Sequence, residues 1–312
     1  MAEVVVETPV PPPKPESASI YELDESLYRL DDEESAFFKA QTGIQDDTEL
    51  KKHLLQIQAE AYAIYPYPCI RMFTWLRLKI ARLFAYDQFL KLGKERDGAI
   101  FLDIGCCFGN DARKAIADGY PMQNVLTSDL HQEFCDLGHK LFRSTPETFP
   151  LPFIAGDVFA PSHLETVPPF TLASPAATPR PDLAALASLN PLRGHVSAIH
   201  ASALFHLFQE EQQLRLARAL AALLSPEPGS MIFGEHHGLP EKGFQFSLRT
   251  GEAKGLFAHS PESWTELWDG VVFEKGTVKV ETELVKRVGA RVDLRLAPGT
   301  AFYLLTWSVT RL

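Results

Sequence analysis

The sequence predicts an α/β fold, in which a doubly wound and mostly parallel sheet of seven strands carries a helical cap on its N-terminal side. Three observations predict it. From residue 95 onward, short apolar runs alternate with helical patterns, as in parallel strands joined by helices. Before residue 95, helical periodicity dominates. The last two apolar runs flank a Pro298-Gly299 turn, so we expect a late antiparallel strand at the sheet edge.

The N-terminal third is expected to form an arm and a cap. Residues 1–20 contain five prolines and almost no apolar pattern, which favours a disordered arm. Residues 21–94 form the expected helical cap or lid. One helical pattern runs from residue 49 to a break at Pro66 and Pro68, and a second helix is expected to end at Gly93. The acidic run 31–34 is expected to be a helix start or a solvated helix face.

Residues 95–312 are expected to form one α/β domain. A proline-rich stretch at 161–191 interrupts the alternation and is expected to be a surface insertion. The expected helices lie at 111–119 (closed by Gly119), 210–224 and 260–272, which a cap at Ser260 and Ser263 opens. The expected strands lie at 99–105, 124–130, 151–159, 195–202, 230–237, 278–288 and 301–312.

The composition excludes several function classes. Forty acidic and thirty basic residues leave a net charge of −10, which disfavours a nucleic-acid partner. Four cysteines are too few for a disulfide scaffold, and no Cys/His spacing resembles a zinc site. The chain shows no secretory signal and no apolar run of about eighteen residues. We therefore expect a reduced, cytoplasmic protein without a membrane span; the sequence leaves open a homodimer through the N-terminal helices.

The strongest motif is FLDIGCCFGNDARKAI at 101–116. A buried strand carries Asp103, a tight turn follows at Gly105, and Gly109 precedes a helix. Cys106 and Cys107 occupy positions where a dinucleotide fingerprint needs close approach to a pyrophosphate, and the lysine of a phosphate-binding loop is missing. The motif thus predicts a corner shaped for an uncharged or zwitterionic ligand group.

This D-x-G-x-x-x-G pattern resembles motif I of the class I S-adenosylmethionine-dependent methyltransferases. The resemblance implies a Rossmann-like, seven-stranded domain over residues 95–312 with S-adenosyl-L-methionine as cofactor. It implies that Asp129 binds the ribose hydroxyls and that Asp157 and the Val158 backbone contact the adenine. It further implies that His200 lies along the methionine moiety. The cofactor site is then expected to comprise Asp103, Gly105, Cys106, Gly109, Asp129, Leu130, Asp157, Val158 and His200.

A finer resemblance implies the kind of acceptor. The phrases FLDIGCCFGNDARK, GDVF and HVSAIHASALFHLF are similar to those of fungal O-methyltransferases of specialised metabolism, including meroterpenoid pathways. This likeness implies a small polyketide- or terpenoid-derived carboxylic acid or phenol as the methyl acceptor.

Histidines and aromatic residues are the candidates for acceptor chemistry. His206 follows the fourth expected strand and could take a phenolic proton, whereas an ionised carboxylate needs no base. Tyr65, Trp75, His236 and His237 are the expected acceptor-binding residues, and no metal spacing accompanies them. Three alternatives stay open: methylation at carbon or nitrogen, a nicotinamide-dependent oxidoreductase, and a Rossmann-like protein without activity.

Overall fold

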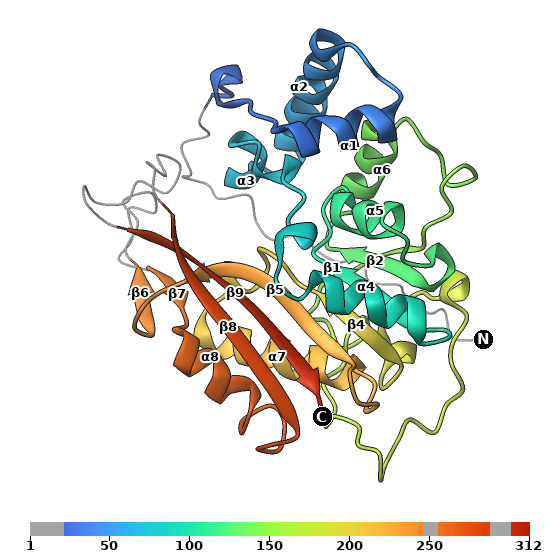
Figure 1. The fold of residues 1–312 in the computed structure, drawn as a ribbon, viewed down its shortest axis with the longest axis vertical. Helices are drawn as coiled ribbons and strands as arrows, with labels where there is room; N and C mark the ends of the chain where they lie inside the picture. Colours follow the sequence, from blue (N-terminus) through green and yellow to red (C-terminus); the bar gives the residue numbers. More distant parts are fainter. Residues whose placement is uncertain (1–21, 246–254, 288–300) are drawn as a thin grey trace, which may run out of the picture.

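The computed structural model describes residues 22–245, 255–287 and 301–312. The arm expected at 1–20 and the turn expected at Pro298-Gly299 lie outside these ranges. Figure 1 shows one large sheet with helices on both faces, and the N-terminal helices gathered beyond one end of its strands. Within the described ranges, no helix combines the length and the apolar character needed to cross a membrane.

The main sheet has seven strands in the order β3-β2-β1-β4-β5-β9-β8. Strands β1 to β5 pair in parallel, whereas β9 runs antiparallel to both of its neighbours. The predicted doubly wound sheet with a late antiparallel strand is confirmed. Its strands are β1 (Ile100–Ile104), β2 (Val125–Asp129), β3 (Phe153–Ala155), β4 (Val196–His200), β5 (Met231–Gly238), β8 (Val278–Arg287) and β9 (Phe302–Arg311).

The second sheet was not predicted from the sequence. It is small and pairs β6 (Gly243–Gln245) with β7 (Leu256–Ala258) in antiparallel fashion. Three-residue strands carry too little periodicity to stand out from loops, so the sequence pattern cannot reveal them.

Helices cover both faces of the main sheet; they are α4 (Tyr86–Glu95), α5 (Asn110–Ala117), α6 (Gln132–Leu141), α7 (Glu210–Leu223) and α8 (Pro261–Trp268). Alternate residues of β1 and β5 point to opposite faces. Phe101 and Phe233 pack on Phe89 of α4, with ring centroids 4.6 and 5.1 Å apart. Leu102 and Ile232 instead join the larger core with α7 and α8. Burial on both faces explains the nearly continuous apolar runs of these strands.

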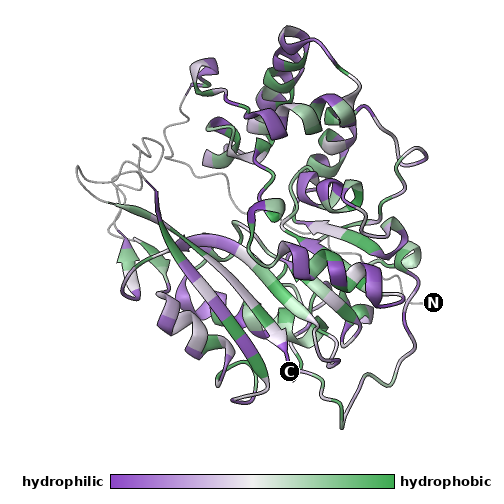
Figure 2. Ribbon diagram, in the orientation of Figure 1, coloured by the Kyte–Doolittle hydropathy of each residue, from purple (hydrophilic) through white to green (hydrophobic). Residues whose placement is uncertain are grey.

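Strand β8 forms the exposed edge of the sheet. Figure 2 shows it as largely hydrophilic along its length, and most of its residues are at least partly accessible. Charged side chains on an edge strand discourage pairing with another chain. On β8 these are Lys279, Glu281, Glu283, Lys286 and Arg287.

The N-terminal region contains η1 (Glu25–Leu27), α1 (Asp32–Thr42), α2 (Asp47–Ile64), α3 (Pro68–Arg71), η2 (Thr74–Leu76) and η3 (Ile80–Arg82). The single helix expected up to Gly93 is wrong, because α3 ends before Phe73, which has a φ of 56°, and α4 begins only at Tyr86. The expected end at Gly93 is wrong too. A Cβ at Gly93 would lie 2.3 Å from the Tyr120 ring, so this glycine permits close packing inside α4 and does not end it.

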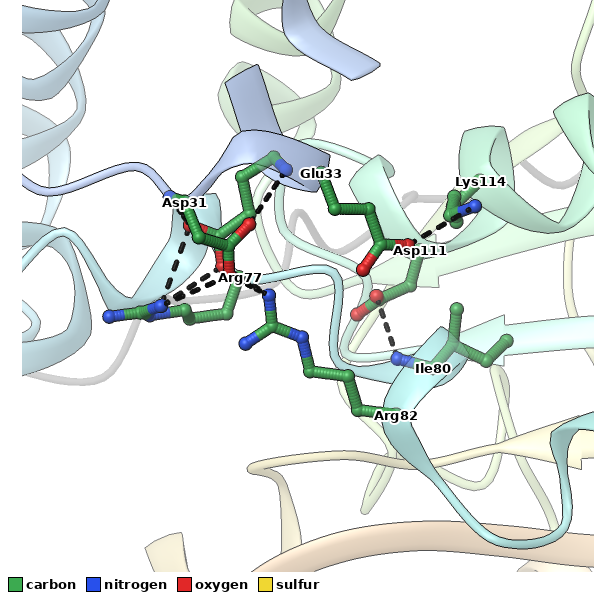
Figure 3. Close-up of polar contacts among 8 residues, drawn as sticks. Asp31, Glu33, Arg77, Ile80, Arg82, Asp111 and Lys114 are labelled. Carbon is green, nitrogen blue, oxygen red and sulfur yellow. Dashed lines mark hydrogen bonds and ion pairs between the residues drawn. The ribbon is translucent and has the colours of Figure 1, made fainter. Parts of the chain in front are cut away.

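The acidic run 31–34 starts a helix, as one of the two expectations had it. Asp31 accepts a hydrogen bond from the Glu34 N–H at 2.9 Å, and the Glu34 side chain accepts from the Asp31 N–H at 3.0 Å. The run is not uniformly solvated, however, because Glu34 is fully buried. Its carboxylate lies 3.1 Å from the Arg77 guanidinium and 2.8 Å from that of Arg82. Figure 3 shows both arginines beside Asp31 at the start of α1.

The helical cap shares a hydrophobic cluster with the sheet domain. Trp75 packs edge-on against Phe108, with centroids 4.9 Å apart, and Phe108 follows β1 directly. Phe38 of α1 stacks on Phe142, just after α6, at 6.0 Å. The cap therefore rests on the residues that follow β1 and β2.

The proline-rich stretch 161–191 is tied to the domain along its length. Leu183 and Leu189 are buried in the main core. Arg180 donates a hydrogen bond to the Asn124 side chain at 2.9 Å and another to the Gly98 carbonyl at 3.3 Å. These contacts hold a segment whose only regular elements in this range are single helical turns.

Candidate functional site

A tight turn joins β1 to α5 at the carboxyl edge of the sheet. Gly105, Cys107 and Gly109 all have left-handed backbones, with φ values of 71°, 51° and 73°. The N–H groups of Gly105 and Cys106 point at the Ser128 carbonyl, at 2.8 and 3.3 Å, so β2 holds the turn in place. A Cβ added at Gly109 would meet nothing within 4 Å, which leaves open space against the backbone there.

Asp129 ends β2 and binds this turn directly. Its Oδ2 accepts a hydrogen bond from the Cys107 N–H at 2.8 Å, while its Oδ1 has only a long contact, 3.5 Å, from the His131 N–H. Burial raises the pKa of the Asp129 carboxyl group, and its backbone donors lower it in part. Within the described residues no cation pairs with it. The carboxylate thus keeps lone pairs for a ligand with hydroxyl groups.

Asp157 lies beside Asp129, one strand along. The Gly156 N–H donates to the Asp129 carbonyl at 2.9 Å, which aligns the ends of β2 and β3. The Asp157 carboxylate accepts the Phe159 N–H at 2.9 Å and so shapes the loop after β3. Leu130 and Val158 are half-buried on either side. Four of the expected cofactor residues therefore lie together at the ends of two adjacent strands.

Asp103 and His200 form a buried pair between β1 and β4. His200 Nδ1 lies 2.8 Å from Asp103 Oδ1, and His200 Nε2 lies 2.7 Å from the Ser202 hydroxyl. Burial lowers the pKa of His200, but the hydrogen bond and charge of Asp103 outweigh it, so the pKa is raised. Asp103 Oδ2 is buried without a hydrogen-bond partner among the described residues. The ring of His200 is thus fully engaged by protein groups.

The expected acceptor-binding histidines are spread over both faces of β5. His236 is buried against Trp264, and its Nδ1 accepts the indole N–H of Trp307 at 2.9 Å, so the ring proton sits on Nε2. Burial lowers the pKa of His236 well below its usual value. His237 points to the other face, with Nδ1 3.1 Å from the Tyr303 carbonyl. His206 lies in η7 (Phe205–Leu207), half-buried, and its charge helps to lower the pKa of His236.

The two expected aromatic contacts lie in the cap. Tyr65 ends α2 and packs on Tyr67, with centroids 4.2 Å apart, and on His131, at 6.1 Å. It therefore lies near the end of β2. Trp75 is only 4% exposed, and its side chain is enclosed by the cluster that the cap shares with the turn.

Three charged residues at this edge were missed by the sequence analysis: Lys79, Asp111 and Glu235. Glu235 is half-buried on β5, and its carboxylate makes no hydrogen bond or ion pair with the described residues. Burial raises the pKa of Glu235, whereas the charges of Lys79 and Arg287 lower it. Asp111 is part of the motif 101–116, two positions after Gly109, so it could have been found from the sequence. Lys79 and Glu235 could not, because only the fold brings them together.

Two further observations limit which ligands the site can hold. In the part of the chain that the structure describes, no three His, Cys, Asp or Glu side chains converge to hold a metal ion. A cavity lies behind the turn, among Cys106, Arg113 of α5 and Cys135 of α6, but neither Asp129 nor Asp157 lines it. Gly109 lines this cavity too, whereas Asp129 and Asp157 lie at the carboxyl ends of β2 and β3, the edge at which open α/β sheets bind ligands.

The chain is similar in sequence to known methyltransferases. Residues 20–76 match the family model described as the meroterpenoid methyltransferase N-terminal domain. The chain is 30% identical over 271 residues to the O-methyltransferase phiE of a Fungal sp. strain, covering 84% of this chain and 80% of that protein. It is 31% identical over 263 residues to the asnovolin E/chermesin D methyltransferase nvfJ of Aspergillus novofumigatus, covering 84% and 83%. Among solved structures, the plantazolicin methyltransferase BpumL in complex with SAH aligns over 89% of this chain and 95% of its own, with 15% identity and a TM-score of 0.43.

Proposed function

The chain belongs to the family of fungal S-adenosylmethionine-dependent methyltransferases that includes these relatives, and from that premise we propose how its own residues serve the reaction. The protein is an O-methyltransferase of specialised metabolism. We propose that the acceptor is a small carboxylic acid or phenol, that the turn 105–109 with Asp129 and Asp157 holds the cofactor, and that the acceptor enters at the carboxyl ends of β4 and β5.

The state of Asp129 is the observation that carries the assignment of the cofactor site. Its carboxylate is largely desolvated, has no cationic partner in the described ranges and keeps lone pairs beside an open turn. A vicinal diol can donate two hydrogen bonds to such a group, and bonds to a charged acceptor are the strong ones. The residues present therefore fit a ribose.

The sulfonium of the cofactor supplies an already activated methyl group when it is bound. The protein then has to orient the acceptor oxygen in line with that group and exclude water. The hydrogen bonds that join Asp103, His200 and Ser202 suit the first task, because they hold strand ends rigidly together. The Glu235 N–H donates to the Ser202 hydroxyl at 3.2 Å, so the series links β1, β4 and β5. The cap, which packs on the turn through Trp75, suits the second.

Isothermal titration tests the cofactor site directly. We expect wild-type protein to bind S-adenosylhomocysteine and the Asp129→Ala variant to bind it about tenfold to a hundredfold more weakly, because hydrogen bonds to a charged group are lost. Glu133→Ala is the matched control, since Glu133 is an exposed acid in the first turn of α6. Equal affinity in wild type and Asp129→Ala would contradict the assignment, and no binding to wild type would contradict the proposed function.

A further inference from the structure

Three basic residues on the segment 77–82 differ in what they bind. Arg77 and Arg82 both pair with the buried Glu34, and Arg82 also pairs with Asp31 at 2.5 Å (Figure 3). Lys79 lies between them and is half-buried, yet it makes no hydrogen bond or ion pair with any described residue. A partly desolvated ammonium without a counter-ion is unfavourable unless a partner arrives.

The backbone on both sides of Lys79 is fixed. Leu78 and Ile80 are fully buried, each in a different hydrophobic cluster. The Ile80 N–H donates to Asp111 Oδ1 at 3.0 Å (Figure 3), and Asp111 lies in the first turn of α5, directly after the turn proposed to hold the cofactor. The segment that carries Lys79 is thus tied to the start of that helix.

The charge of Lys79 acts on the carboxyl edge of the sheet. Burial raises the pKa of Asp111 and of Glu235, and Lys79 lowers both. Lys79 also opposes protonation of His200 and lowers the pKa of Cys107 in part. These four groups lie on α5, β5, β4 and the turn. The geometric counterpart is the bond from the Ile80 N–H to Asp111, which places the backbone next to Lys79 against the first turn of α5.

Two of the histidines predicted for the site, His200 and His236, already use ring nitrogens in hydrogen bonds with protein groups. Both ring nitrogens of His200 are already hydrogen-bonded to protein groups, so neither is open to an incoming proton. His236 uses its lone pair to accept the indole N–H of Trp307. A nearby cation lowers the pKa of an acidic acceptor, because it stabilises the oxyanion. The acceptor can then ionise without a histidine to take its proton.

We propose that Lys79 binds the anionic oxygen of the methyl acceptor, as carboxylate or phenolate. This rests on the proposed function and adds to it the residue that selects an ionised acceptor. The acceptor proton is lost to water before transfer. The oxygen then forms the new O–CH₃ bond while the methyl–sulfur bond of the sulfonium breaks, and its electron pair stays on sulfur as a neutral thioether.

The test uses 2,4-dihydroxybenzoate, which offers both oxyanion sources, with farnesoate as a carboxylate and resorcinol as a phenol. Purified full-length protein is supplied with S-adenosylmethionine, and products are read by mass spectrometry before and after alkaline hydrolysis. Alkali removes a methyl ester and leaves an aryl ether, so the product shows which oxyanion Lys79 serves. We expect methylation of at least one anionic probe.

The variants Lys79→Met and Lys79→Arg separate an acceptor-binding role from a structural one. We expect Lys79→Met to raise KM for the acceptor about tenfold to a hundredfold, with less effect on kcat and unchanged affinity for S-adenosylhomocysteine. Lys79→Arg keeps the charge and should recover most of the loss. For a phenol, Lys79→Met should also move the rise of kcat/KM to higher pH. Lys91→Met is the control, because Lys91 is exposed on the surface of α4 and pairs there with Glu95 at 3.8 Å.

Three outcomes would overturn the proposal. One is a Lys79→Met variant with the KM and pH profile of wild type. The second is a loss of kcat and a flattened pH profile in His206→Asn or Glu235→Gln while Lys79→Met stays normal, since the role would then belong to a base. The third is cofactor-bound wild type that methylates no anionic probe; binding of the cofactor in that sample would leave the proposed function standing.

Discussion

Two groups of charged residues, one on each side of the segment 77–82, are arranged in opposite ways. Where the cap meets this segment, Asp31, Glu34, Arg77 and Arg82 satisfy one another within a few ångströms. At the carboxyl edge of the sheet, Asp129, Glu235 and Lys79 are half-buried without an ion-pair partner in the described ranges. The first group stabilises the fold without a ligand; the second costs stability that a bound ligand would return.

The contrast shows why a folded protein keeps unpaired charges. A buried charge without a partner is unfavourable, so a sequence under selection for stability alone would remove it. Three such groups support the proposal that ligands bind at this edge of the sheet. Replacing single members of the two groups should therefore change stability in opposite directions.

Glu34→Ala removes the centre of the paired group and should lower the free energy of unfolding by about 2–3 kcal/mol, because two arginines and the Asp31 N–H lose a charged acceptor. Urea denaturation monitored by circular dichroism measures it. The control is Glu33→Ala, since Glu33 is exposed and lies 3.6 Å from Lys114. Surface ion pairs contribute about 0–1 kcal/mol, so this variant should lose less than about 1 kcal/mol of unfolding free energy. Equal losses in the two variants would contradict the distinction.

Asp129→Asn should do the reverse and stabilise the ligand-free protein by about 1 kcal/mol at neutral pH, because it removes an unpaired and desolvated charge yet leaves an acceptor for the Cys107 N–H. The pKa of Asp129 is raised in the folded state. Its contribution to stability is therefore full below the unfolded pKa of about 3.9 and is lost as pH rises through the folded pKa.

Thermal melts of this variant and wild type between pH 4 and pH 8 check the sign. The advantage of Asp129→Asn should grow as pH rises, while its affinity for S-adenosylhomocysteine falls. A variant that is less stable than wild type at pH 7 would show that the ionised carboxylate contributes to the fold.

Arg82→Met and Lys79→Met make the finest comparison, because both remove a cation from the same short segment. Arg82→Met should lower the free energy of unfolding by about 1 kcal/mol, since Arg82 is partly exposed and pairs with two carboxylates. Lys79→Met should change it by less than about 0.5 kcal/mol. Chemical denaturation resolves the two values, and a larger loss for Lys79→Met would assign that residue to the scaffold.

The sheet was predictable because burial on both faces makes its strands plain apolar runs, and because Gly105 and Gly109 mark the turn. The acidic strand ends Asp129 and Asp157 could likewise be placed beside it, since parallel strands end at one edge. The region between residues 69 and 93 was not predictable. Its apolar residues repeat at helical spacing, but Phe73 adopts a left-handed backbone and the tertiary bond from Ile80 to Asp111 replaces a helical one.

The rest of the site could not be predicted for a related reason. Lys79 is one of several basic residues among apolar ones, and nothing local distinguishes it from Arg77 or Arg82. Only the fold shows that Glu34 engages both arginines while Lys79 forms no ion pair with the residues that the structure describes. Glu235 similarly follows an apolar run, and its lack of a partner is a property of the neighbouring elements. The roles of His206, Tyr65 and Trp75 stay predictions.

The position of β9 bears on how the protein matures during synthesis. β9 is the last strand of the sheet in chain order, yet it lies between β5 and β8, and Trp307 at its centre is 1% exposed. A nascent chain that has released everything up to residue 287 therefore carries β8 with no neighbour to pair with and β5 with an open edge. The sheet closes only when β9 leaves the ribosome, so premature termination before it would leave two unpaired edges and a protein prone to aggregate.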